Sequence, residues 1–91
     1  MFLLVSYDIC DKKRLPKVAK LMEGYGVRVQ YSVFECLLTD RQVQEMERRL
    51  RRLIKPEEDS VRFYRICESC KEEIVIIGQG KVSENEYYFI T

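Results

Sequence analysis

The chain has 91 residues, 46% hydrophobic and 34% charged, a balance typical of one folded domain and not of a disordered segment. No apolar run reaches the length of a membrane span and no cationic leader precedes the first apolar run, so we expect a cytoplasmic protein with no membrane partner. Histidine is absent, which excludes imidazole acid–base pairs and leaves carboxylates with a metal ion as the route to any hydrolysis.

The net charge of +1 hides an uneven distribution along the chain. Residues 12–55 hold twelve Lys and Arg against five acids, whereas residues 56–91 hold four against eight. A chain divided in this way is suited to binding a polyanion on one surface.

Residues 2–8 form a short apolar run of β-forming side chains and predict a buried strand. Alternation along this strand places Leu4 and Ser6 on the same face as Asp8. A carboxylate at the carboxyl end of a strand, followed by cations, is typical of a phosphate or metal site. Taken alone, such an aspartate is more often a turn or capping residue.

Residues 13–25 predict an amphipathic helix, because Gly24 and Gly26 supply a stop and apolar side chains recur at helical spacing: Leu15, Val18, Ala19, Met22 and Tyr25. Asp11 is a candidate cap, although Pro16 moves the expected start of the helix later in the chain. The opposite face carries three candidate phosphate contacts, Lys13, Lys17 and Lys20. Lysines in this pattern are also typical of a solvated helix face.

Residues 27–38 are rich in β-branched and aromatic side chains and predict a strand of unusual length, bent, bulged or divided in two. We expect Tyr31, like Tyr7, to lie in the core. The other face carries Arg28, Ser32 and Phe34, a mixture that is not suited to water alone and that we assign to an interface.

A second amphipathic helix is predicted from a cap at Thr39 or Asp40 to the neighbourhood of Pro56. Its buried stripe consists of four apolar residues, Val43, Met46, Leu50 and Leu53. On the opposite side four cations align, Arg41, Arg48, Arg52 and Lys55. Arg48 and Arg52 are candidate nucleic-acid contacts, and a solvated face is again the alternative.

Residues 60–66 and 73–77 predict two further strands, joined by a turn that holds Cys67 and Cys70. Without histidine or a second matched cysteine pair, a cysteine-containing turn is a better interpretation than a zinc site or a redox pair. The glycines at 78–80 close the second strand and are too close together to form a phosphate loop.

The last apolar segment, residues 87–90, includes Tyr88 and Ile90 and needs a sheet edge in this molecule or in another one. If the long strand is divided, the elements follow the order β, α, β, β, α, β, and two helices cover one face of an antiparallel sheet. The expected fold class is therefore α+β, with the other face of the sheet open.

The open face is expected to carry Leu4 and Phe34, and an apolar patch in this place marks an interface. We infer a homodimer, sheet against sheet, with Asp8 of each copy near the shared axis. Two facing carboxylates repel unless a cation intervenes, and Mg²⁺ (or Mn²⁺) accepts one or two carboxylates. Asp8 is thus a candidate metal-binding residue.

Several separated motifs resemble one family: YDI before a charged loop and a basic helix, then RVQYSVFE, then YRICESC before a strand that ends in glycine. In order and spacing they are similar to the CRISPR-associated Cas2 family, the small adaptation subunit of that immune system, over essentially the whole chain. The resemblance implies one ferredoxin-like βαββαβ domain over residues 1–91, with about residues 82–91 as a terminal strand that crosses to the partner subunit. Its interface would include Ser32, Phe34, Tyr88 and Ile90.

The same resemblance implies work with the Cas1 integrase in acquiring new spacers for antiviral defence. Members are often described as metal-dependent endonucleases that act on single-stranded RNA or on duplex DNA. Asp8 matches the family's acid, so the resemblance implies that Asp8 is the catalytic and metal-binding residue. Other residues on the motif positions are Tyr7, Arg14, Arg28, Ser32 and Phe34, of which Arg14 or Arg28 would offset charge on the phosphate. Pro16 and Cys10 depart from the pattern, since the family commonly has a basic and a small polar residue there.

Two alternatives use the same fold. In the first, the dimer is a scaffold without catalysis, the basic helices hold duplex phosphates, and the chemistry belongs to the integrase. In the second, the dimer is a small-ligand sensor or regulatory module, a class that has no need of basic stripes.

Overall fold

The computed structural model describes residues 1–82, and these form one sheet and three helices. The elements follow in the order β1 (Phe2–Asp8), α1 (Arg14–Glu23), β2 (Val27–Gln30), β3 (Val33–Leu37), α2 (Asp40–Leu53), β4 (Ser60–Ile66) and α3 (Glu68–Glu72). The strands pair antiparallel in the order β2-β3-β1-β4. This is the βαββαβ arrangement of a ferredoxin-like fold, followed by a short helix, and it confirms the predicted fold class. Within residues 1–82 no helix is both long and apolar enough to cross a bilayer.

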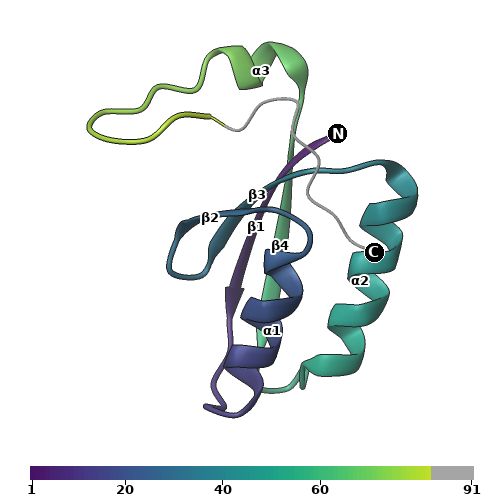
Figure 1. Ribbon diagram of the computed structural model, residues 1–91. Helices are drawn as coiled ribbons and strands as arrows, with labels where there is room; N and C mark the ends of the chain where they lie inside the picture. The colour runs from purple at the N-terminus through teal and green to yellow at the C-terminus, as the bar shows by residue number, and fades with distance from the viewer. Residues whose placement is uncertain (83–91) are drawn as a thin grey trace.

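Both long helices pack on the same face of the sheet, and α3 lies at the end of the sheet near the N-terminus (Figure 1). Helix α1 buries Val18 and Met22. Of the stripe predicted for α2, Val43, Met46 and Leu50 are buried and Leu53 is partly buried. Strand β1 lies in the middle of the sheet and supplies Leu3, Val5 and Tyr7 to the same core. The expected alternation of β1 and the burial of Tyr7 are therefore confirmed.

The two long helices begin at local signals in the sequence. The Thr39 hydroxyl accepts a hydrogen bond from the Gln42 amide, and the Gln42 side chain accepts one from the Thr39 amide, so α2 starts with a complete capping box. Before α1, the Asp11 carboxylate accepts hydrogen bonds from the amides of Lys13 and Arg14. Pro16 lies in the first turn, where its missing amide proton leaves no intrahelical bond unmade.

The predicted long strand is two strands, β2 and β3, joined by a turn at Tyr31 and Ser32 with an irregular register between Arg28 and Gln30. The Ser32 carbonyl accepts a hydrogen bond from the Tyr7 amide, which fixes the turn against the end of β1. Tyr31 projects from this turn and is 72% exposed, so the expectation that it lies in the core is wrong. The turn contains no glycine or asparagine, which explains why the sequence did not locate it.

The assignment of Phe34 to the open face of the sheet, and with it to a dimer interface, is wrong. Phe34 pairs with Val5 in the register of β1 and β3, and its ring is fully buried with Cys36 beneath the helices. Paired residues of neighbouring strands share a face, so the burial of Val5 decides the direction of Phe34. Leu4 lies on the open face as expected, together with Val33 and Glu35.

The strand predicted at residues 73–77 is also wrong. Residues 68–72 form α3, and residues 74–77 carry no regular secondary structure in the described part of the chain. Val75 and Ile77 are 80% and 96% exposed there, although their side chains are β-forming. The segment is not among the paired strands of residues 1–82. The expected terminal strand, with Tyr88 and Ile90, lies outside the described residues.

A buried carboxylate joins the loops at one end of the sheet. Asp59 accepts hydrogen bonds from the amides of Cys10 (3.0 Å) and Lys55 (2.9 Å) and from the Arg14 guanidinium (2.8 Å from Nε). Arg14 also pairs with Asp11 and Glu58, and its side chain is only 14% exposed. We call these four side chains (Asp11, Arg14, Glu58 and Asp59) the Arg14 cluster. It ties the loop after β1 to the end of α2 and the start of β4.

Gly26 marks a close approach between the α1–β2 connection and β3. A Cβ atom on Gly26 would meet the Glu35 carbonyl oxygen and would lie 2.6 Å from Cys36 Sγ. We expect Gly26→Ala to lower the free energy of unfolding by about 1–3 kcal/mol, because neither neighbour can move without disturbing the sheet. Urea denaturation followed by circular dichroism would measure the change.

Gly24→Ala is the matched control, since a Cβ there would meet only the Leu21 carbonyl oxygen, at 3.4 Å, and the backbone is already helical. Its effect should stay within about 0.5 kcal/mol. Equal destabilisation by the two substitutions would contradict the close approach at Gly26.

The Arg14 cluster predicts acid sensitivity. The Arg14 guanidinium, followed by the Lys55 and Cys10 amides, holds the pKa of Asp59 well below its ordinary value of 3.8. A depressed carboxylate pKa stabilises the fold above that ordinary value, and the stability is lost as the pH falls from about 5 toward 2. In thermal melts across this range, Asp59→Asn should melt at a lower temperature than wild type at pH 7 and depend less on pH. Glu57→Gln, on an exposed side chain nearby, should follow the wild-type curve. If the melting temperature of Asp59→Asn fell with pH as steeply as that of wild type, Asp59 would not be the source of the acid sensitivity.

Candidate functional site

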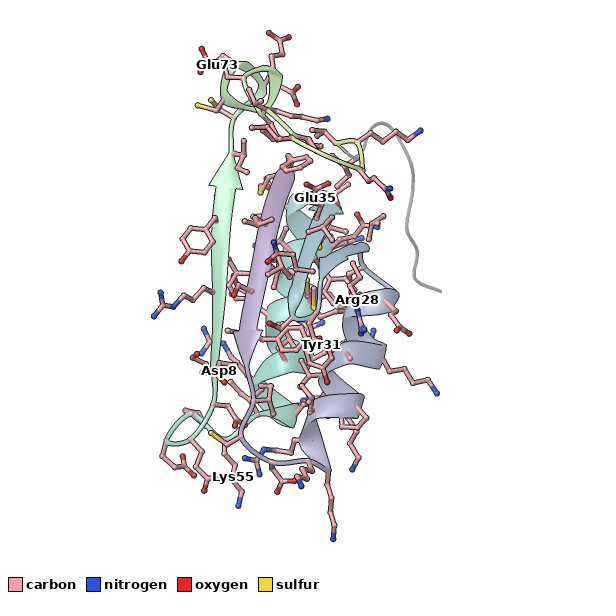
Figure 2. All side chains as sticks on the ribbon, turned by 90° about the vertical axis from the view of Figure 1, so that its left-hand side faces the viewer. Asp8, Arg28, Tyr31, Glu35, Lys55 and Glu73 are labelled. Atoms are coloured by element: carbon pink, nitrogen blue, oxygen red, sulfur yellow. The ribbon has the colours of Figure 1, made fainter. Side chains whose placement is uncertain are left out.

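The predicted catalytic residue Asp8 lies at the carboxyl end of β1, paired with Ser60 of β4, and is exposed. Figure 2 shows it at the end of the strand, far from Glu73 at the opposite end of the molecule. It lines a hollow of about 200 Å³ together with Ser6, Ser60, Arg62 and Tyr64. The strand thus presents a carboxylate to solvent beside one cation and several hydroxyl groups.

This hollow adjoins a larger one, of about 840 Å³, over the open face of the sheet, because Ser6 and Tyr64 line both. Leu4, Val33 and Glu35 form part of its floor, and residues 76–81 contribute to its rim. Asp8 therefore stands at the margin of the face on which the sequence predicts a second copy.

Arg62 is the cation nearest in the sheet to Asp8, and the sequence analysis missed it. It pairs with Ser6 across β1 and β4, so it shares the open face with Asp8. The neighbouring Tyr64 hydroxyl raises the pKa of the Arg62 guanidinium, which keeps its charge at every relevant pH. The alternation of residues 60–66 contained the signal: Ser60, Arg62 and Tyr64 form the polar face of a strand whose other face is partly buried.

The residues at this site fit a divalent cation only in part. Among residues 1–82 no group of three or more carboxylate or cysteine ligands could hold a metal ion. Asp8 is the one acid among the described residues that line the smaller hollow. Mg²⁺ is bound through one or two carboxylates and completes its shell with water and phosphate oxygens, so one Asp8 from each of two copies would satisfy it.

Arg14 was expected to bind nucleic acid, and the structure places its guanidinium in ion pairs within the chain. Three carboxylates surround its guanidinium, at 2.8 Å (Asp59), 2.9 Å (Glu58) and 3.2 Å (Asp11). These partners largely neutralise its charge and leave only 14% of its side chain exposed. In this chain Arg14 therefore has a structural role between the loops.

Arg28 is partly engaged within the chain. Its guanidinium lies 3.7 Å from a Glu23 carboxylate oxygen and 5.3 Å from the centre of the Phe34 ring, and 40% of the side chain is exposed. Figure 2 shows Arg28 and Tyr31 together on the hairpin side of β1, apart from Asp8. Ser32 lies in the turn of the same hairpin, half-buried.

The other predicted cations remain on the surface of the helical layer. Lys13, Lys17 and Lys20 are exposed along α1, and Arg48 and Arg52 are exposed along α2. Both helices lie on the side of the sheet away from its open face (Figure 1). The protein therefore carries its carboxylate site and its basic rows on different surfaces.

Arg49 belongs to α2 but differs from its neighbours. Its guanidinium donates a hydrogen bond of 3.0 Å to the Tyr25 hydroxyl, which in turn donates one of 2.6 Å to Glu45. The contact fastens α2 to the end of α1, so Arg49 serves the fold, in contrast to Arg48 and Arg52.

Comparison with known proteins identifies the family. The family model described as CRISPR associated protein Cas2 matches residues 1–74. The chain is 53% identical over 85 residues to the CRISPR-associated endoribonuclease Cas2 1 of Chloroflexus aurantiacus, which covers 92% of this chain and 91% of the relative.

Solved structures agree with that match. Cas2 of Streptococcus pyogenes superposes with a TM-score of 0.76 at 38% identity, over 86% of this chain and all (100%) of that one. A chain of a partial Cas6-RT-Cas1–Cas2 complex superposes with a TM-score of 0.73 at 31% identity, over 84% of this chain and 89% of that one. The length matched, the identity and the shared fold agree, and the chain belongs to the CRISPR-associated protein Cas2 family.

Proposed function

We propose that this protein is a metal-dependent endonuclease of CRISPR adaptation that acts as a homodimer, with Asp8 as its catalytic and metal-binding residue. The observation that carries the proposal is the exposed Asp8 carboxylate, which lies beside Arg62 at the margin of the open sheet face. The substrate is a phosphodiester bond of single-stranded RNA or duplex DNA.

The relatives support the reaction class and the partner. The Chloroflexus aurantiacus relative is named an endoribonuclease, and a structural neighbour is part of a complex with Cas1. The proposed role in spacer acquisition follows from membership of the family, with Cas1 as the integrase that this dimer accompanies.

The open face supports dimerisation. No helix of residues 1–82 covers it, and Leu4 and Val33 contribute apolar surface to its hollow. Tyr64 (47% exposed) and Ile76 (40%) add to the same hollow. Packing two copies through this surface would remove apolar area from water and would bring the two Asp8 carboxylates toward a common axis.

Two such carboxylates repel each other, and this repulsion favours binding of a divalent cation between them. Bound Mg²⁺ or Mn²⁺ would supply polarisation of the phosphate and a water of lowered pKa. Asp8 holds the site and Arg62 offsets negative charge on the phosphate, the role that the sequence suggested for Arg14 or Arg28. The Ser60 and Tyr64 hydroxyls lie at the same hollow and can orient substrate oxygens.

Asp8→Ala tests the catalytic assignment. It should lower Mg²⁺-dependent cleavage of RNA or DNA by at least about a hundredfold, the usual scale for loss of a catalytic polar group. Dimerisation and nucleic-acid affinity should remain, because Asp8 is not buried. Cleavage would be followed on labelled substrates with and without Mg²⁺, and dimerisation by sedimentation.

Glu57→Ala is the matched control, since it removes an exposed carboxylate away from the hollow. It should cleave like wild type. Equal turnover by wild type and by Asp8→Ala, purified in the same way, would remove Asp8 from the reaction.

A second candidate function is a non-catalytic DNA-binding scaffold of the integration complex. The observation that favours it is the exposure of the basic rows on α1 and α2, well away from Asp8. Contacts of lysine and arginine with phosphates position a duplex without reading its sequence. In this version Asp8 is structural and Cas1 performs the chemistry.

The basic rows predict strongly salt-dependent binding. Replacing Arg48 and Arg52 by glutamine should weaken duplex binding and reduce the slope of log K against log salt by about 0.9 for each phosphate that the variant no longer neutralises. Arg49→Gln on the same helix is the control, because that guanidinium is engaged with Tyr25. Fluorescence anisotropy across a salt series gives both slopes, and equal slopes for the double variant and wild type would exclude α2 from the interface.

A further inference from the structure

Cys67 and Cys70 lie together on a surface that the proposed nuclease does not use. Cys67 precedes the first residue of α3, and Cys70 follows three positions later, so that the two thiols come from one turn of chain. Both are exposed, and α3 stands at the end of the sheet opposite Asp8 (Figure 1). The pair is therefore accessible to a small reagent without entry into the hollow at Asp8.

The two thiols are neighbours at the start of α3, since Cys67 is the N-cap residue and Cys70 follows three positions later, and they differ in acidity. The Ser69 hydroxyl, whose oxygen lies 3.3 Å from Cys67 Sγ, and next the amide and thiol of Cys70 lower the pKa of Cys67 to about 7. The pKa of Cys70 is raised, because its thiol donates to the Cys67 sulfur. One sulfur is thus poised as a thiolate and the other as a protonated thiol beside it.

The remaining cysteines provide a contrast. The Cys36 thiol is buried in the core, where burial raises its pKa to about 12. The Cys10 thiol donates a hydrogen bond of 3.0 Å to the Glu58 carbonyl oxygen and has no second cysteine beside it. Among the described residues, only Cys67 and Cys70 combine exposure, proximity and unequal acidity.

We propose that Cys67 and Cys70 form a reversible dithiol–disulfide pair that reacts with small-molecule disulfides. A zinc site at this position is disfavoured, because two thiolates supply only half of a tetrahedral shell and no further ligand group joins them within residues 1–82. Disulfide exchange needs only the two sulfurs and an exposed approach.

The exchange proceeds in two steps. The Cys67 thiolate attacks one sulfur of the small disulfide, whose S–S bond breaks, so that a mixed disulfide forms and one thiolate leaves and takes up a proton. Cys70 then loses its proton to solvent and attacks Cys67 Sγ, and the second small thiol leaves. The two cysteines lose two electrons in total, and the small disulfide gains them as it becomes two thiols.

The disulfide would lie between β4 and the segment that reaches the open-face hollow. Helix α3 places the Lys71 ammonium 5.1 Å from the centre of the Phe2 ring, and the chain beyond it reaches the rim of the open-face hollow at residues 76–81. A bond between Cys67 and Cys70 would lock the first turn of α3 and so fix the start of this segment.

The test uses the full chain with Cys10→Ser, which removes the other exposed thiol. After reduction and treatment with oxidised glutathione at pH 7, we expect a mass lower by two hydrogen atoms and a peptide that links Cys67 to Cys70. Cys70→Ser should stop at a stable glutathione adduct on Cys67. Cys67→Ser should react at least about threefold more slowly, as for a thiol of ordinary acidity.

The pH dependence supplies a second readout. Alkylation of Cys67 by iodoacetamide should rise with a midpoint near pH 7, and Ser69→Ala should shift that midpoint upward because it removes a hydrogen bond to the thiolate. The proposal is overturned if the chain with both cysteines accumulates the glutathione adduct without closing the disulfide. It is equally overturned if Cys67 and a control peptide thiol are alkylated with the same midpoint.

Discussion

The structure depends on one buried carboxylate, that of Asp59, whose side chain is fully removed from solvent. A buried carboxylate is stable only when hydrogen bonds and an opposite charge offset its loss of hydration. Here two backbone amides and the Arg14 guanidinium supply them. The arrangement fixes the loop that follows β1, and this loop begins directly after Asp8. Asp59 thus stabilises the loop next to the proposed site without being part of that site.

The two proposed activities, nucleic-acid binding by the basic rows and metal binding at Asp8, lie on opposite sides of the sheet. Helices α1 and α2 cover one face of the sheet (Figure 1), and their basic rows are exposed, while the other face stays open with Asp8 at its margin. A duplex along the helices would lie on the outside of a dimer formed through the open faces. Under this arrangement duplex binding by the basic rows and metal binding at Asp8 can be altered independently, because no residue serves both.

Much of the fold could be predicted from periodicity, since the alternation of β1 and the stripes of α1 and α2 are strong local signals. The direction of Phe34 could not, because burial on a strand is decided by the neighbouring strand, here by its pairing with Val5. The role of Arg14 was hidden for a related reason: its partner Asp59 is 45 residues away in sequence. Position on a family motif predicted that Arg14 matters, and only the fold shows what it does.

Asp8 was predicted as a site residue from its place at the end of a buried strand and from the family motif, whereas Arg62 was missed, although the alternation of β4 places it on the same face. Single residues at strand ends are easily seen in a sequence. Their neighbours across a sheet become visible only when the register is known.

The central position of β1 has a consequence for synthesis of the chain. Strand β1 is synthesised before its two neighbours, β3 and β4, and β4 ends at Ile66. Until that residue emerges, one edge of β1 lacks its neighbouring strand, and the apolar side chains of Leu3 and Val5 cannot be fully buried. Such non-local pairing slows folding and exposes the nascent chain to aggregation. The interval is short, because only residues 9–59 separate β1 from the strand that completes its pairing.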